Sequence, residues 1–63
     1  MRYYVTDYNG IPLASQPEEG YTLTEAIARQ NREVKEAMRL FNMTYKEADR
    51  DFGVIDENFN TVL

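Results

Sequence analysis

TLTEAIARQNREVKEAMRLF, residues 22–41, is the stretch that decides the fold. It contains no proline or glycine, and Thr22 and Glu25 have the spacing of a capping box, in which each side chain bonds the other residue's backbone N–H. Large apolar residues recur at helical spacing within one narrow arc: Leu23, Ile27, Val34, Met38 and Phe41. The sequence therefore predicts one long amphipathic helix whose apolar stripe must be covered by the rest of the chain.

Two polar features of this helix have alternative interpretations. Gln30 falls inside the apolar stripe, where it is either a satisfied polar group bonded to backbone or water, or a polar contact at an interface. Arg32, Lys35 and Arg39 form a basic strip on the opposite face. This strip is either solvated or a docking strip for an acidic partner or for phosphates.

The segments on both sides of the helix have the pattern of β-hairpins. Tyr3–Thr6 is rich in aromatic and β-branched residues, and Asn9-Gly10 is a strong hairpin turn. A second strand is expected over residues 11–15, with Pro12 restricting it to an edge. After the long helix, a second capping box at Thr44 predicts a short helix over residues 45–51. A third strand over residues 52–56, a turn and a short strand over 61–63 then complete a second hairpin.

These elements predict an α+β fold in the order ββααββ, with residues 1–63 forming a single small domain. The expected architecture is an antiparallel sheet of two β-hairpins packed on one long central helix. Placing residue 3 over residue 52 aligns the two hairpins, so that Asp7 matches Asp56 and Asn9 matches Asn58. We attribute this match to shared turn chemistry, because turns favour Asp and Asn.

Alternation along the strands divides the predicted sheet into two faces. One face packs on the helix, and no helix remains to cover the other, which would carry Tyr4, Tyr8 and Ile55. Exposed aromatic and aliphatic side chains on one face are typical of a protein interface. This face is either a set of scattered surface tyrosines with the second helix lying partly over them, or a homodimer seam or partner-binding face. For the second case we expect these three residues to anchor a partner, within a charged rim formed by Asp49, Asp51, Asp56 and Glu57.

The composition argues against most catalytic and metal chemistry. The chain has no cysteine and no histidine, so it lacks the commonest general base, the thiolate nucleophile and the usual transition-metal ligands. The run that begins at Asp49 fails the calcium-loop pattern, because Gly53, Val54 and Asn60 stand where that loop needs an oxygen ligand, glycine and glutamate. The sequence predicts no enzyme activity, no cofactor and no metal.

Charge and hydropathy narrow the range of partners. The net charge is −4, and the acidic residues concentrate before and after the long helix. Nucleic-acid binding is disfavoured because Asp7, Asp56 and Glu57 surround the tyrosines that would stack on bases. The sequence has no apolar run long enough to cross a membrane and no apolar signal-peptide segment, so we expect a cytoplasmic protein without membrane contact.

The remaining function classes are then few. The leading hypothesis is a non-catalytic interaction module that occupies a basic surface on a protein partner. In size and acidity the chain is similar to short phage-encoded proteins that block host enzymes or defence complexes, which implies a small regulator or inhibitor, although no motif identifies a family. The alternatives are nucleic-acid binding through the sheet tyrosines or the basic strip, and a structural homo-oligomer such as a homodimer.

Overall fold

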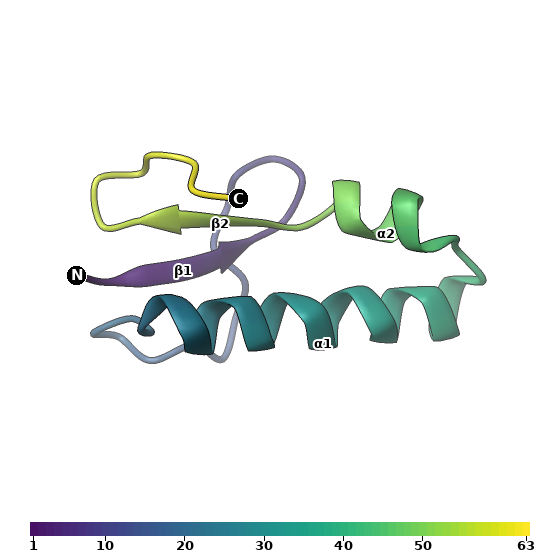
Figure 1. Cartoon of the computed structure of the whole chain (residues 1–63), viewed down its shortest axis with the longest axis horizontal. Coiled ribbons are helices and arrows are strands. Elements are labelled where there is room, and N and C mark those ends of the chain that lie inside the picture. The colour runs from purple at the N-terminus through teal and green to yellow at the C-terminus, as the bar shows by residue number, and fades with distance from the viewer.

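The computed structural model describes residues 1–63 and shows a small α+β arrangement (Figure 1). The element order is β1 (Tyr3–Thr6), α1 (Leu23–Phe41), α2 (Tyr45–Arg50) and β2 (Gly53–Asp56). The molecule is elongated, with extents of 33 × 18 × 17 Å. Helix α1 runs along its length, and both the sheet and α2 lie against it, one after the other. Neither helix has an apolar stretch of the length that a bilayer crossing requires.

Both helices begin at the predicted capping boxes. The Glu25 N–H donates to Thr22 Oγ1 (3.2 Å), and the Thr22 N–H donates to Glu25 Oε1 (2.9 Å). Thr44 and Glu47 repeat this arrangement at the start of α2. Asn42 ends α1 in the left-handed conformation, with φ 53°, a conformation that asparagine tolerates better than most residues. The two helix predictions are therefore confirmed, and their short connection folds α2 back along α1.

The α+β class is confirmed, but the predicted ββααββ order with two hairpins is more than the structure shows, because the sheet has only two strands. Strands β1 and β2 pair antiparallel, with Val5 opposite Val54 and Tyr4 opposite Ile55. Residues 11–13 follow the predicted turn but contact β1 only through an isolated bridge between Thr6 and Pro12. Pro12 has no N–H to donate to a ladder. Residues 60–63 likewise form one isolated bridge with β2, between Ile55 and Thr61, and the Val54 N–H also donates to the Leu63 carbonyl at 3.1 Å.

The outer edge of β1 is covered by partners that are not a regular strand. Tyr3 and Tyr21 exchange two backbone hydrogen bonds, both 2.9 Å long. The side-chain amide of Gln16 takes the next position, where it accepts from the Val5 N–H (2.7 Å) and donates to the Val5 carbonyl (2.9 Å). Ser15, with φ 64°, turns the chain so that Gln16 reaches this place. These contacts explain why the second predicted strand does not form.

Arg29 fastens the loop before α1 to the helix. Its guanidinium donates to the carbonyls of Ala14 (3.1 Å) and Ser15 (3.0 Å) and to the Tyr21 hydroxyl (3.0 Å). It also forms an i,i+4 ion pair with Glu33 at 3.1 Å. Burial, the largest single effect, lowers the pKa of Arg29, but the hydrogen bonds to Tyr21 and Glu33 together outweigh it and raise that pKa.

The core consists of two small clusters on the inner side of α1. Val5 and Val54 of the sheet pack on Ala26, and Ala48 of α2 packs on Val34 and Ala37. The three alanines let the helix approach both layers closely, which suits a chain in which only 9 of 63 residues are buried.

Gln30 is also buried, and it lies on α1 between the core positions Ala26 and Val34. Its Nε2 donates to the Phe52 carbonyl at 3.2 Å. The interpretation of Gln30 as a satisfied polar group within the apolar stripe is therefore confirmed.

Candidate interaction surface

The residues predicted to anchor a partner differ in their exposure. Tyr8 is 75% exposed, as an anchor must be, but Ile55 is only 6% exposed. Tyr4 is half-buried, and its hydroxyl donates to the Glu18 carbonyl at 3.0 Å. The expectation that this whole sheet face is open is therefore wrong, because the loop before α1 folds back against Tyr4. Alternation assigned the faces of the sheet but could not show how that loop would fold.

The predicted charged rim is divided between two parts of the molecule. Asp49 lies on α2 and Asp51 caps its end, whereas Asp56 and Glu57 lie at the far end of β2. Figure 1 shows these two places at opposite ends of β2. The structure thus brings Asp56 and Glu57 close to the N-terminal end of β1, and separates both from Tyr8.

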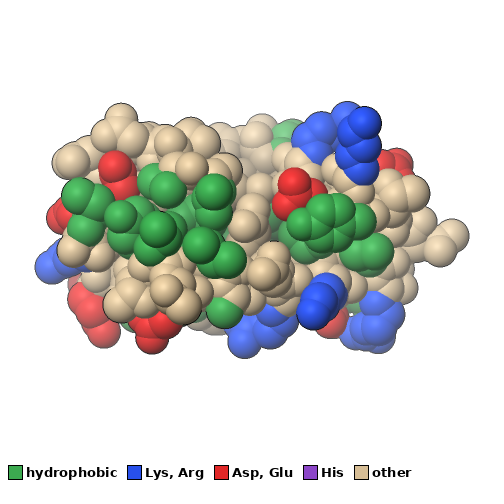
Figure 2. Space-filling model, in the orientation of Figure 1, with side chains coloured by type: hydrophobic (Ala, Val, Ile, Leu, Met, Phe, Trp, Pro, Cys, Tyr) green, Lys and Arg blue, Asp and Glu red, His purple; other side chains and the backbone are tan.

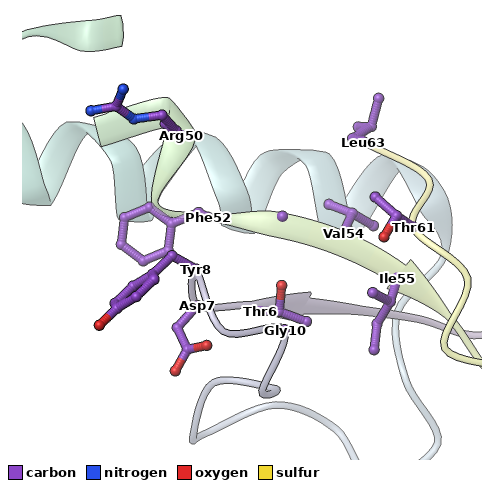
Figure 3. Close-up of a pocket in the computed structure, with 11 residues that line it drawn as sticks. Thr6, Asp7, Tyr8, Gly10, Arg50, Phe52, Val54, Ile55, Thr61 and Leu63 are labelled. Atoms are coloured by element: carbon purple, nitrogen blue, oxygen red, sulfur yellow. The ribbon is translucent and has the colours of Figure 1, made fainter. Parts of the chain in front are cut away.

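A hollow of about 230 Å³ lies beside Tyr8. Figure 3 shows the Tyr8 and Phe52 rings close together on one side of it and residues 61–63 on the other. The hollow has one carboxylate, Asp7, and that oxygen already accepts from the N–H groups of Asn9 (2.8 Å) and Ile11 (3.1 Å). The Asp7 carboxylate therefore serves the turn, and the rest of the lining combines apolar side chains with Arg50, Thr6 and Thr61.

The turns that follow β1 and β2 are built in the same way. Asp56 Oδ1 accepts from the N–H groups of Asn58 (2.8 Å) and Asn60 (3.0 Å), as Asp7 does in the first turn. The Asn60 backbone N–H has the largest effect on the pKa of Asp56 and lowers it; burial opposes this, and the remaining bonds from Asn58 and the Asn60 side chain add to it. Asp56 is thus engaged within its own turn, which leaves Glu57 as the freer carboxylate.

The net negative charge of the molecule lies on one half of it. We define the sheet half as residues 1–28 and 53–63, and the helical half as residues 29–52. The sheet half has six acidic side chains and one basic side chain, Arg2, whereas the helical half has five acidic and six basic side chains. Figure 2 shows this separation as mostly red at one end and more blue toward the other. The long-range electrostatic field of the protein therefore favours encounters in which the sheet half faces a positively charged surface.

Exposed apolar side chains occur on the helical half, where Phe41 is 71% exposed although it belongs to the predicted apolar stripe, and also at this acidic end. Met1 and Phe59 are strongly exposed there, and Arg2 donates its backbone N–H to Glu57 Oε1 at 3.3 Å, which holds the start of the chain beside the second turn. Glu18 and Glu19 line a shallow depression together with Arg2. The sheet half thus presents exposed apolar groups together with the exposed carboxylates of Glu18, Glu19 and Glu57.

Sequence reasoning did not single out Phe59. Aligning the two hairpins had already placed Phe59 opposite Gly10, and a large aromatic at a turn position that favours glycine is the signal that could have identified it. Phe59 is in fact 74% exposed.

The fold and this surface define a small acidic α+β domain with an electrostatically polarised, apolar-tipped end. Comparison with models of protein families, with curated proteins and with solved structures finds no match to the chain. The function is therefore inferred from the geometry and charge of the chain itself.

Proposed function

We propose that this protein is a non-catalytic interaction module, a small acidic regulator or inhibitor that acts by occupying a basic surface of a protein partner. The observation that carries the proposal is the concentration of net negative charge on the sheet half, together with exposed apolar side chains at the same end. Charge of this kind steers a diffusing protein toward a basic surface, and the apolar groups supply contact area once it arrives.

The state of the carboxylates agrees with an electrostatic role. Asp56 is committed to its turn, but Glu18 and Glu19 are exposed and carry no ion pair. Carboxylates that a protein leaves unpaired on one surface are available to Lys and Arg of a partner, with little competition from its own cations. The charged rim of the proposed interface therefore lies on the sheet half and does not include Asp49 and Asp51.

Nucleic-acid binding has weaker support. The half-buried Tyr4, bonded through its hydroxyl to the Glu18 carbonyl, does not offer a free face of the kind on which bases stack. On the basic strip of α1, Arg39 pairs with Glu36, which reduces the charge available to phosphates. A protein partner is the better match to both observations.

The experiment uses two variants of equal net charge as bait. Glu18→Lys/Glu19→Lys/Glu57→Lys reverses the sheet half, and Glu36→Lys/Asp49→Lys/Asp51→Lys makes the same total change on the helical half. Each bait is incubated with nuclease-treated lysate of the cells in which the protein occurs, at low and at high salt. We expect the wild type and the helical-half variant to retain the same basic protein at low salt, and the sheet-half variant to lose it.

The proposal is overturned if the two variants retain the protein equally, because the location of the charge would then not matter. It is also overturned if nuclease treatment abolishes the capture, which would indicate nucleic acid, or if the captured protein has no basic surface.

A further inference from the structure

The two matching turns differ in one residue that bears on recognition. In each turn the fourth residue donates its N–H back to the carbonyl of the first: Gly10 to Asp7 and Phe59 to Asp56, both at 3.0 Å. The fourth residue has a positive φ in both, 79° at Gly10 and 65° at Phe59. This left-handed conformation suits glycine and is unfavourable for a bulky side chain. The second turn therefore tolerates a strain that the first avoids.

Packing in the core does not offset this strain. The Phe59 side chain is strongly exposed and belongs to neither of the two core clusters. The glycine turn shows that the same hydrogen bonds form without a side chain at this position. A strained residue that adds no stabilising contact to the fold is a candidate for a functional contact with another molecule.

The surroundings of Phe59 indicate what it would contact. It follows Glu57 by two residues in the same turn, and Glu57 is bonded to the backbone of Arg2. Glu18 and Glu19 line a shallow depression together with Arg2. The aromatic ring thus projects from the part of the molecule that carries its excess negative charge, so a surface that accepts the ring must also accommodate carboxylates.

We propose that Phe59 is the anchor by which the sheet half docks, inserting its ring into an apolar pocket of a partner protein whose rim carries Lys or Arg. This inference rests on the proposed function and adds to it the contact residue and the form of the complementary site. Glu57, Glu18 and Glu19 face the basic rim, while the ring is buried at the centre, which is the usual arrangement of an aromatic hot spot within a polar rim.

A phage-displayed library of random peptides serves as the probe, selected against the immobilised full chain at low salt. We expect the enriched peptides to combine Lys or Arg with large apolar residues. Synthetic copies of these peptides are then titrated against Phe59→Gly and against Tyr8→Ala, which removes an equally exposed aromatic from the other turn. Phe59→Gly is expected to weaken binding by about tenfold or more, and Tyr8→Ala by less than about twofold.

Thermal unfolding of both variants separates binding from folding. Phe59→Gly relieves strain, so its melting temperature should equal or exceed that of the wild type, and any loss of binding then comes from the missing ring. Light scattering on the wild type and on Phe59→Gly tests for a second copy as the occupant. A wild-type dimer that becomes monomeric in Phe59→Gly would overturn the proposal of a basic partner.

The remaining outcomes distinguish this inference from the proposed function. Basic peptides that bind Phe59→Gly as tightly as the wild type, but fail to bind Glu18→Lys/Glu19→Lys/Glu57→Lys, would overturn the anchor and leave the basic partner in place. Enrichment of acidic peptides, or no enrichment, would overturn both.

Discussion

The side-chain amide of Gln16 pairs with the backbone of Val5 as a residue of a neighbouring strand would. Gln16 Oε1 accepts from the Val5 N–H at 2.7 Å, and Gln16 Nε2 donates to the carbonyls of Val5 (2.9 Å) and Leu13 (2.8 Å). One side chain from the connecting loop therefore satisfies both backbone groups of a buried residue. This contact links the loop, β1 and the core cluster around Val5.

Replacing Gln16 with alanine should lower the free energy of unfolding by about 1–3 kcal/mol, because the buried Val5 N–H loses its acceptor, although the Val5 carbonyl keeps its bond from the Leu13 N–H (2.9 Å). Urea unfolding of Gln16→Ala measures this change. Gln16→Glu is the informative companion: it keeps an acceptor for the Val5 N–H but places negative charge against two carbonyls, so it should also destabilise. A change below about 0.5 kcal/mol in Gln16→Ala would show that water replaces the amide without loss.

Replacing Arg29 should release the loop before α1. Arg29→Met keeps the aliphatic packing but removes the bonds to the carbonyls of Ala14 and Ser15 and to the Tyr21 hydroxyl. We expect a loss of about 1–3 kcal/mol in unfolding free energy, and faster amide hydrogen exchange over residues 13–21. Arg39→Met is the control, because its ion pair with Glu36 is exposed and should contribute little. Equal effects of both substitutions would contradict the role of Arg29.

Acid should weaken the second turn. The folded state lowers the pKa of Asp56 from its ordinary value of 3.8. The stabilisation by this carboxylate is therefore fully present above that value, where Asp56 is ionised in both the folded and the unfolded chain. It declines as the pH falls below it, since the unfolded chain then binds a proton more readily than the folded one. Melting temperatures of the wild type should fall more steeply than those of Asp56→Asn between about pH 4 and pH 2. Parallel slopes would show that the turn hydrogen bonds do not depend on the charge.

The helices could be predicted from the sequence because the interactions that start and end them are local. Each capping box lies within four residues, and the apolar stripe is periodic along one uninterrupted stretch. The pairing of the strands was harder to predict from the sequence. Gln16 reads as part of a polar connector, and its role as a pairing partner for Val5 exists only once the loop has folded over β1.

The exposed surface could also be predicted only in part, because it depends on how separate segments fold together. Alternation correctly placed Val5 and Val54 toward the helix, but the burial of Ile55 depends on how the flanking segments fold. Phe59 is the reverse case: its position opposite Gly10 follows from the aligned hairpins, but its role could be inferred only from its φ and exposure in the folded chain. Local interactions thus determine the turns, whereas tertiary folding determines which side chains remain exposed.

Exchanging the residue types at the fourth positions of the two turns should change stability in opposite directions. Phe59→Gly removes a bulky side chain from a residue with φ 65°, so unfolding free energy should rise by up to about 1 kcal/mol. Gly10→Ala introduces a Cβ at φ 79°; nothing lies within 4 Å of that Cβ, so the expected loss of about 1 kcal/mol reflects backbone strain alone. Urea unfolding of both variants provides the measurement. Destabilisation by Phe59→Gly would mean that the ring supports the fold, and the case for an outward-facing anchor would fail.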